Sequence, residues 1–379
     1  MSQQFPSVDP DGLLEYSVVF TDRALNHMSR TFQQVMRDLS AMLKATYAAD
    51  AVALVPGGGS YGMEAVARQL AGGQKCVILR NGWFSYRWTQ ILDVGGIAPA
   101  ASVLKARATT NERQSAFAPA PIAEVIATIR AEKPALLFAP HVETASGMLL
   151  PDEYVRAVAD AMHEVGGLFV LDCVASGAAW VNMQASGVDV LISAPQKSWS
   201  ASPCAALVML SAAAKARVEA TASSSFTLDL KKWLQIMQAY EKGGHAYHAT
   251  LPTDALAGLH AAMQATQTVG LAELRTRQFE LGRRLRALLA QRGFKSVAAQ
   301  GFEAPGVVVC YSDDDGLHNG SKFIAQGLQT AAGVPLMCDE PPDYKTFRIG
   351  LFGLDKLTDV DGTVARLERA LTDIATGRS

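Results

Sequence analysis

The sequence predicts an α/β fold with a mainly parallel sheet in a large domain, followed by a small C-terminal α+β domain. Short apolar segments alternate with helix-like segments between residues 51 and 210, a pattern typical of strands joined by crossover helices. After about Gly270 the pattern changes to a long Arg-rich helix followed by widely spaced strands and helices. The length of 379 residues allows two domains.

The composition indicates a folded protein that acts on a small molecule. Hydrophobic residues make up 49% of the chain and charged residues 18%, so disorder is excluded for most of it. The 34 Lys and Arg residues nearly balance 36 Asp and Glu residues, and the net charge is −2. Such a balance creates no global field that would attract nucleic acid or anionic lipid.

The first two thirds of the chain supply the elements of the large domain. The apolar spacing from Thr21 to about Tyr47 predicts an amphipathic helix with Thr21 as its N-cap. The predicted strands are Ala51–Val55, Cys76–Leu79, Ala135–Phe138, Leu168–Leu171, Val188–Ile192 and Ala205–Leu210. Helices are expected between several of them, at Tyr61–Leu70, Ile122–Ala131 and Asp152–Val165. This alternation predicts a parallel sheet that is buried on both faces.

The last third of the chain is predicted to fold as a compact α+β unit. Its strands are expected at Val307–Tyr311 and Thr346–Leu351. Its helices are expected at Leu271–Arg292, Lys322–Ala332 and Val360–Ile374. We therefore divide the chain into an N-terminal arm (1–20), a large domain (21–269) and a small domain (270–379).

The cysteines and the N-terminal segment favour a cytoplasmic enzyme. The five cysteines are scattered, with no CxxC pair and no spacing typical of a zinc site, so we expect no bound metal. Residues 1–20 do not resemble a signal peptide, and no apolar stretch is long enough to span a bilayer. We expect no association with a membrane.

The loop at residues 55–62 (VPGGGSYG) fits three motifs. It follows a strand and opens a helix, so its backbone N–H groups can bind the phosphate of a cofactor. It also matches the dinucleotide fingerprint G-x-G-x-x-G, but the next strand ends at Arg80 where a ribose-binding acid is expected. The same letters match G-x-S-x-G, which would make Ser60 the nucleophile of a serine hydrolase. The sequence upstream of Ser60 looks mainly helical, so we favour the phosphate site.

An acid and a lysine at the ends of two neighbouring strands point to the cofactor. Asp172 follows a hydrophobic strand, and Lys197 comes just after the next one. Strand ends of this kind face the ligand crevice of an open α/β sheet. A lysine that can form a Schiff base, an acid that can keep a pyridine nitrogen protonated and a phosphate-binding loop together predict pyridoxal 5′-phosphate chemistry.

Each of these two residues has a chemical role and a structural alternative. Asp172 would hold the positive charge on the ring that makes the substrate Cα–H acidic. Lys197 would move the proton between Cα and the cofactor as general base and then general acid. The alternative is that Asp172 caps a turn and Lys197 is simply solvated.

Two segments make the chain resemble a known family. The stretches LFAPHVETASGMLLP (137–151) and LFVLDCVASGAAWVNMQASGVDVLISAPQKSWSASP (168–203) resemble the class V, fold type I aminotransferases, especially the alanine-glyoxylate and serine-glyoxylate group. The resemblance implies transfer of an amino group from a small amino acid to a 2-oxo acid such as glyoxylate or pyruvate. It also implies a homodimer with shared active sites.

The resemblance further implies which residues contact pyridoxal phosphate. Phe84 would stack on the pyridine ring, Val174 would pack against the other face, and Thr144 would place a hydroxyl near the ring. For Phe84 the alternative is an aromatic residue with a structural role. The expected phosphate contacts are Gly58, Gly59, Ser60 and Gln196.

Three more residues take roles from the same resemblance. Tyr247 and Thr250 would reach the cofactor phosphate of the neighbouring subunit, so that two chains build each site. Arg348 lies between apolar residues on a predicted strand and would bind the substrate α-carboxylate. The alternative for Arg348 is a permanent ion pair with Asp339 or Glu340.

The chain departs from the family at its N-terminus and raises one alternative reaction. Residues 6–20 lack the Gly-Pro stretch that contributes to the substrate pocket in the family, which leaves the substrate open. Cys338 lies near the segment expected to form the substrate-facing rim, so a lyase of the cysteine desulfurase type is an alternative. The acids beside Cys338 should raise its thiol pKa and oppose that role.

Overall fold

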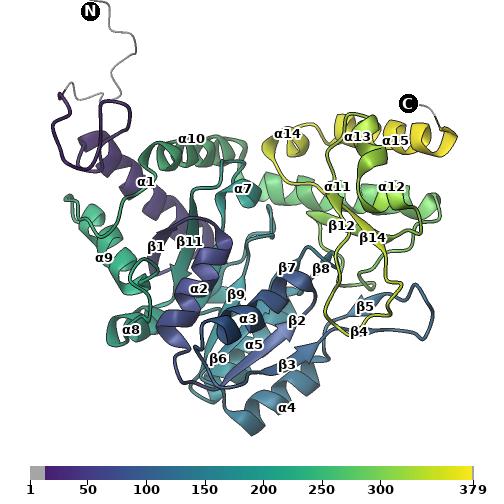
Figure 1. The fold of residues 1–379 in the computed structure, drawn as a ribbon, viewed down its shortest axis with the longest axis horizontal. Helices are drawn as coiled ribbons and strands as arrows, with labels where there is room; N and C mark the ends of the chain where they lie inside the picture. The colour runs from purple at the N-terminus through teal and green to yellow at the C-terminus, as the bar shows by residue number, and fades with distance from the viewer. Residues whose placement is uncertain (1–12, 378–379) are drawn as a thin grey trace, which may run out of the picture.

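The computed structural model describes residues 13–377, which form a central sheet covered by helices and a smaller C-terminal sheet (Figure 1). Most of the predicted arm (1–20) therefore lies outside the described residues. In the described range, no helix is both long and apolar enough to cross a membrane.

The central sheet has seven strands in the order β1-β11-β10-β9-β6-β2-β3. The strands are β1 (Ala51–Pro56), β2 (Cys76–Arg80), β3 (Ser102–Lys105), β6 (Leu136–Pro140), β9 (Leu168–Asp172), β10 (Val190–Ser193) and β11 (Ala205–Leu210). Most of their residues are buried because helices cover both faces. The six strands predicted from apolar runs are confirmed to within two residues at each end, and β3 was not predicted.

One strand breaks the parallel arrangement. β11 runs antiparallel to both β1 and β10, whereas the other paired strands of this sheet are parallel. Only residues 194–204 connect β10 to β11, and a parallel crossover needs a dozen or more residues. The prediction of a mainly parallel sheet is confirmed.

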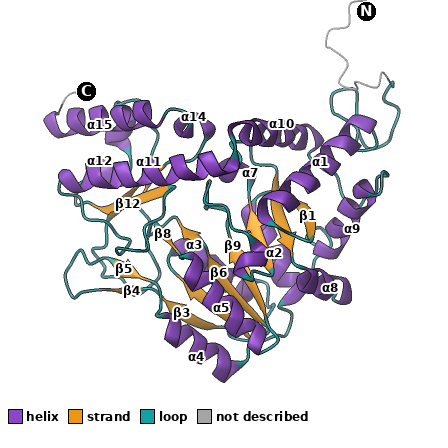
Figure 2. Cartoon of the chain, turned by 180° about the vertical axis from the view of Figure 1, so that it is seen from behind, coloured by secondary structure: helices purple, strands orange, loops and turns teal. Residues whose placement is uncertain are grey.

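Helices surround this sheet (Figure 2). They are α1 (Arg30–Tyr47), α2 (Gly59–Leu70), α3 (Trp83–Val94), α4 (Ile122–Glu132), α5 (Asp152–Glu164), α6 (Met183–Ser186), α7 (Pro195–Ser198), α8 (Ala212–Ala220), α9 (Leu230–Glu241) and α10 (Thr253–Val269). Two short hairpins accompany them: β4 (Arg107–Ala108) with β5 (Phe117–Ala118), and β7 (Val142–Glu143) with β8 (Met148–Leu149).

The predicted start of the first helix is wrong. The helix begins at Arg30, and Ser29 rather than Thr21 is its N-cap, with the Ser29 hydroxyl accepting a hydrogen bond from the Phe32 N–H. Upstream, the Asn26 side chain accepts a hydrogen bond from the Met28 N–H. Such local side-chain bonds favour turns over helix, although the apolar spacing continues through this segment.

The C-terminal region has a three-stranded antiparallel sheet in the order β12-β14-β13. Figure 1 shows β12 and β14 side by side in it. Its strands are β12 (Val307–Tyr311), β13 (Ala331–Ala332) and β14 (Thr346–Gly350), and its helices are α11 (Leu271–Gln291), α12 (Asp315–His318), α13 (Ser321–Ala325), α14 (Leu354–Leu357) and α15 (Val360–Thr376). The predicted helix Lys322–Ala332 is wrong beyond Ala325. Gly327 adopts a φ of +73°, which a helix cannot continue through, and Ala331–Ala332 pairs with β14.

The buried apolar clusters show how the chain packs on either side of the predicted domain boundary at 269/270. The buried residues of the main cluster all precede Gly270, which separates α10 from α11. Two smaller clusters combine residues from both sides of that boundary, such as Ala178 with Leu274 and Val142 with Val307. We propose that two domains share a closely packed interface there.

Candidate active site

A cavity of about 250 Å³ opens at the carboxyl end of the central sheet. It lies where the loops that follow β9 and β10 begin, as expected for a ligand crevice in an α/β sheet. Its lining brings together most of the predicted site residues: Gly59, Ser60, Phe84, Thr144, Asp172, Val174, Gln196 and Lys197. Four further residues that were not predicted complete the lining: Met63, Arg87, Val142 and Ala175. The remaining predicted residues, Gly58, Tyr247, Thr250 and Arg348, lie outside this lining.

Asp172 ends β9 and is 8% exposed. One carboxylate oxygen accepts a hydrogen bond of 2.9 Å from the Val174 N–H. Burial raises the pKa of Asp172 to about 6, with a smaller contribution from the negative charge of Glu143. A buried carboxylate of this kind is stabilised by a cationic partner, which a protonated ring nitrogen would provide.

Lys197 lies on the short helix α7 and lines the same cavity. Its Nζ is 5.5 Å from the centre of the Phe352 ring and 6.0 Å from the centre of the Phe84 ring. Burial lowers the pKa of Lys197, and Asp172 opposes that shift. A lowered pKa leaves more of the amine neutral and therefore nucleophilic.

The loop at residues 57–62 has a structural reason for its glycines. A Cβ at Gly59 would lie 2.5 Å from a methyl carbon of Val174, and a Cβ at Gly62 would lie 2.5 Å from Cβ of Ala206. Gly58 is the N-cap of α2, and space is open beside it. α2 can therefore pack closely against the sheet, and the N–H groups of its first turn face the cavity.

Ser60 is not arranged as a hydrolase nucleophile. In the described part of the chain, its hydroxyl hydrogen-bonds to Nη1 of Arg87 at 3.0 Å and to no histidine. A serine nucleophile needs a neighbouring general base, which a guanidinium cannot be. The geometry favours the anion-binding interpretation of this loop.

Glu143 is a site residue that the sequence analysis missed. It is fully buried, and its oxygens accept hydrogen bonds from the N–H groups of Phe84, Ser85 and Ala145 and from the Ser85 hydroxyl. These bonds fix the N-terminus of α3 and thereby Phe84. A Cβ at Gly82 would lie 2.7 Å from Glu143, so only glycine fits there. The available signal was that Glu143 is the single acid in the stretch LFAPHVETASGMLLP (137–151).

Arg348 on β14 has no carboxylate within ion-pair distance among the described residues. Its Nε donates to the Ala332 carbonyl at 2.7 Å, and its guanidinium lies 5.5 Å from the centre of the Phe84 ring. The alternative of a permanent ion pair is wrong. Asp339 pairs with Lys105, and Glu340 accepts backbone N–H groups of residues 336–338.

Cys338 is placed poorly for a persulfide-forming reaction. The side chain is buried, does not line the cavity, and has its Sγ 3.3 Å from the Arg80 carbonyl oxygen. Burial raises the pKa of the Cys338 thiol to about 12, with smaller contributions from Glu143 and Glu340. A neutral buried thiol is a poor nucleophile, so the geometry does not favour the desulfurase alternative.

Tyr247 and Thr250 lie in the loop between α9 and α10, outside the cavity of their own chain. The Tyr247 hydroxyl is 3.1 Å from the Thr250 hydroxyl, and the side chain of Tyr247 is 54% exposed. This exposed pair leaves both hydroxyls available to another subunit. Their predicted role stays a prediction.

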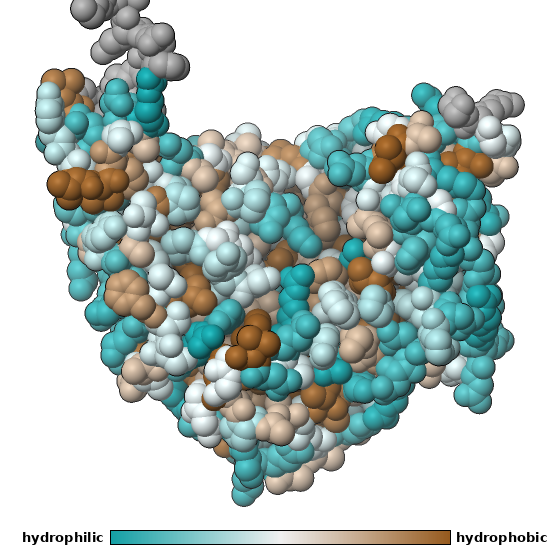
Figure 3. All heavy atoms as spheres, in the orientation of Figure 1, coloured by the Kyte–Doolittle hydropathy of each residue, from teal (hydrophilic) through white to brown (hydrophobic). Residues whose placement is uncertain are grey.

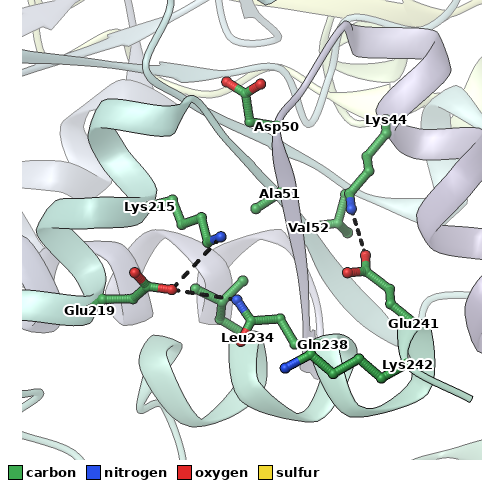
Figure 4. A pocket seen from close by; sticks show the side chains of 10 residues that line it. All are labelled: Lys44, Asp50, Ala51, Val52, Lys215, Glu219, Leu234, Gln238, Glu241 and Lys242. Atoms are coloured by element: carbon green, nitrogen blue, oxygen red, sulfur yellow. Dashed lines mark hydrogen bonds and ion pairs between the residues drawn. The ribbon is translucent and has the colours of Figure 1, made fainter.

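A second hollow, of about 430 Å³, lies beside the edge strand β1 and between α1, α8 and α9 (Figure 4). Two of its three lysines lie beside acids: Lys44 pairs with Glu241 at 2.7 Å, and Lys215 lies 3.9 Å from Glu219. The charges that line it neutralise each other, and it holds none of the predicted site residues. We assign no chemistry to it.

Comparison with known proteins identifies the family. The model of the family "Aminotransferase class-V" matches residues 14–319, which is more than half of the chain. The chain belongs to the class V aminotransferase family. The enzymes of this family depend on pyridoxal 5′-phosphate, which confirms the predicted cofactor, enzyme class and fold class.

Two relatives and one solved structure illustrate the similarity. The aminotransferase is 26% identical to an L-aspartate–glyoxylate aminotransferase of Paracoccus denitrificans, covering 92% of this chain and 86% of the relative. It is also 26% identical to a 2-aminoethylphosphonate–pyruvate transaminase of Salmonella schwarzengrund, covering 89% and 88%. An alanine–glyoxylate aminotransferase from Nostoc sp. has the same fold, with a TM-score of 0.74, 22% identity and coverage of 92% and 89%.

The cavity of the aminotransferase fits pyridoxal phosphate. Lys197 offers an amine and Asp172 a carboxylate within one cavity, which are the groups that the aldehyde and the ring nitrogen require. The N-terminus of α2 offers N–H groups for a phosphate. Phe84 offers an aromatic surface for the ring.

Proposed function

We propose that this aminotransferase moves an amino group from a small amino acid to a 2-oxo acid such as glyoxylate or pyruvate. The observation that carries the proposal is the meeting of Lys197 and Asp172 in one cavity, with the guanidinium of Arg348 beside it. Glyoxylate and pyruvate are the acceptors named for the relatives. The expected product is the amino acid that forms when the 2-oxo acid receives the amino group.

We assign the chemical roles within the site as follows. When bound, pyridoxal phosphate supplies an electron sink that makes the proton on the substrate Cα acidic. Asp172 keeps the ring nitrogen protonated through its negative charge. Lys197 would take up the proton from the substrate Cα and give it back, as general base and then general acid. Phe84 and Val174, which line the cavity, would hold the ring between them, and Thr144 would place its hydroxyl near the ring.

The phosphate is assigned to the N-terminus of α2. Its first turn would bind the phosphate oxygens through backbone N–H groups and the Ser60 hydroxyl. Gln196, which neighbours Lys197 and lines the same cavity, would add a side-chain amide. The proposed phosphate contacts are Gly58, Gly59, Ser60 and Gln196.

We further propose a homodimer in which Tyr247 and Thr250 complete the site of the partner. Four large apolar side chains are exposed in residues 13–18, namely Leu13, Leu14, Tyr16 and Val18. Hydrophobic groups, drawn in brown, are exposed at the upper left of Figure 3. The nearby Tyr247 ring lies 5.5 Å from the His27 ring. Packing of this surface against a second copy of the chain would remove these apolar side chains from water. The mass in solution tests this assembly.

We also place the enzyme in the cytoplasm. All five cysteines are buried and free. Proteins that keep their thiols reduced are typical of a reducing compartment.

The function is tested by mixing the purified holoenzyme with amino donors and 2-oxo acid acceptors in all pairwise combinations. We expect the donor alone to bleach the colour of the cofactor and the acceptor to restore it, with amino acid product detected by mass spectrometry. Sulfide release from cysteine without amino transfer would instead indicate the lyase alternative. No spectral change with alanine, serine, aspartate or glycine would argue against catalysis.

Replacement of Arg348 by glutamine tests how the substrate is held. The guanidinium has no acid partner in the described chain, so a substrate α-carboxylate can bind to it by charge-assisted hydrogen bonds. We expect KM for the donor to rise about ten- to a hundredfold, with a smaller change in kcat and an unchanged cofactor spectrum. Arg348→Lys should lie between the two. An unchanged KM in Arg348→Gln would exclude this role.

A further inference from the structure

Arg87 is a cation in the cavity that the proposed phosphate contacts leave unexplained. It lies on α3, three residues after Phe84, so both side chains share one face of the helix. Its guanidinium carbon lies 4.7 Å from the centre of the Phe84 ring, and its Nη1 donates to the Ser60 hydroxyl at 3.0 Å. Within the described residues, no carboxylate lies within ion-pair distance of it.

The proposed phosphate contacts lack positive charge. Gly58, Gly59 and Ser60 offer neutral donors at the N-terminus of α2, and Gln196, Tyr247 and Thr250 are also neutral. A helix N-terminus carries only about half an elementary charge, whereas a phosphate monoester carries nearly two negative charges at neutral pH. A charge of that size in a cavity is poorly compensated by neutral groups alone.

We propose that Arg87 supplies the missing charge and binds the phosphate of the cofactor together with Ser60. This inference rests on the proposed function, because it requires pyridoxal phosphate in the cavity. The geometry favours Arg87 over Lys197 and Arg348 as the cation that binds the phosphate. Lys197 is assigned to the aldehyde, and Arg348 hydrogen-bonds to the carbonyl oxygens of Ala332 and Thr144 rather than to the phosphate loop.

The position of Arg87 is held from two sides. Glu143 anchors the first turn of α3, which carries Phe84 and leads directly into Arg87. The Phe84 ring supports the guanidinium by a cation–π contact. α2 and α3 also pack against each other, which keeps Arg87 beside the first turn of α2. A cation held in this way needs little reorganisation to bind an anion.

The test compares pyridoxal phosphate with pyridoxal, which has the same ring and aldehyde but no phosphate. Both are titrated into the apoenzyme of the wild type and of Arg87→Met, followed by the colour that forms at Lys197. We expect Arg87→Met to weaken pyridoxal phosphate about ten- to a hundredfold, because hydrogen bonds to charged groups are lost. Pyridoxal should bind the variant as it binds the wild type.

Arg87→Lys keeps the charge but loses the planar fork, so its affinity for pyridoxal phosphate should be intermediate. Inorganic phosphate should compete with pyridoxal phosphate for the wild type more strongly than for Arg87→Met. If Arg87→Met does not fold, Arg87→Lys carries the same comparison, with a smaller loss expected for pyridoxal phosphate alone.

Three results would overturn the inference. Equal losses for both ligands would indicate that Arg87 only supports the Phe84 ring. Unchanged affinity for both ligands, with a raised KM for aspartate but not alanine, would assign Arg87 to a second acid group of the substrate. Unchanged affinity and unchanged KM values would leave Arg87 without a ligand. Failure of the wild type to bind pyridoxal phosphate would instead overturn the proposed function itself.

Discussion

Replacement of Lys197 by alanine is expected to abolish aminotransfer and the visible absorbance of the cofactor. The variant loses both the amine that condenses with the aldehyde and the group that carries the proton between Cα and C4′. Loss of a general acid–base group alone costs about a hundred- to ten-thousandfold in turnover. We expect kcat to fall at least a thousandfold in steady-state assays.

The controls for this variant separate the chemistry from the charge. Lys197→Arg keeps a cation in the cavity but cannot form the covalent bond, so it should be as inactive as Lys197→Ala. Lys215→Ala removes a half-buried lysine on α8, beside the second hollow (Figure 4), and should retain full activity. Borohydride reduction of the wild type should fix the cofactor to the peptide that contains residue 197. Attachment at another lysine would disprove the assignment.

The predicted strands were accurate because their signal is local. A strand buried on both faces is apolar along most of its length, and β2 and β9 show this in their first four residues. The direction of β11 is not local, since it depends on the length of the connection after β10. The helix start at Arg30 was missed for a related reason: hydrogen bonds of Ser29 and Asn26 determine it, although the apolar spacing begins earlier.

The candidate site was predicted where residue type and strand position coincide. Asp172 and Lys197 follow strands, and the chemistry of each is distinctive enough to be proposed before the fold is known. Glu143 and Arg87 were missed because their importance depends on tertiary neighbours. Glu143 matters only because α3 begins beside it, and Arg87 only because Ser60 of α2 lies 3.0 Å away. Neither contact can be inferred from spacing along the chain.

Asp172→Asn should reduce turnover by roughly a thousandfold or more, because the neutral amide cannot keep the ring nitrogen protonated. The substitution preserves the size of the side chain, and its oxygen can still accept the hydrogen bond from the Val174 N–H. The covalent attachment of the cofactor at Lys197 should persist, since it does not require the charge. Turnover equal to that of the wild type would show that Asp172 does not act on the cofactor.

The same substitution should stabilise the apoenzyme above pH 6. Burial raises the pKa of Asp172 from 3.8 to about 6, so the folded apoenzyme disfavours the carboxylate relative to the unfolded chain. The contribution of Asp172 to wild-type stability is therefore fully present below pH 4 and is lost as the pH rises from about 4 to 6, by roughly 3 kcal/mol. Asn carries no charge and escapes this loss.

We expect urea unfolding of the apoenzymes at pH 7.5 to give a higher free energy of unfolding for Asp172→Asn than for the wild type. This difference should shrink towards pH 4. Asp172→Ala is the matched control. It also removes the charge, but it leaves the Val174 N–H without its acceptor and should be less stable than Asp172→Asn. A buried carboxylate that serves to bind a cationic ring lowers the stability of the apoenzyme, because its charge has no partner before the cofactor binds. If Asp172→Asn is less stable than the wild type at pH 7.5, Asp172 serves the fold rather than the cofactor.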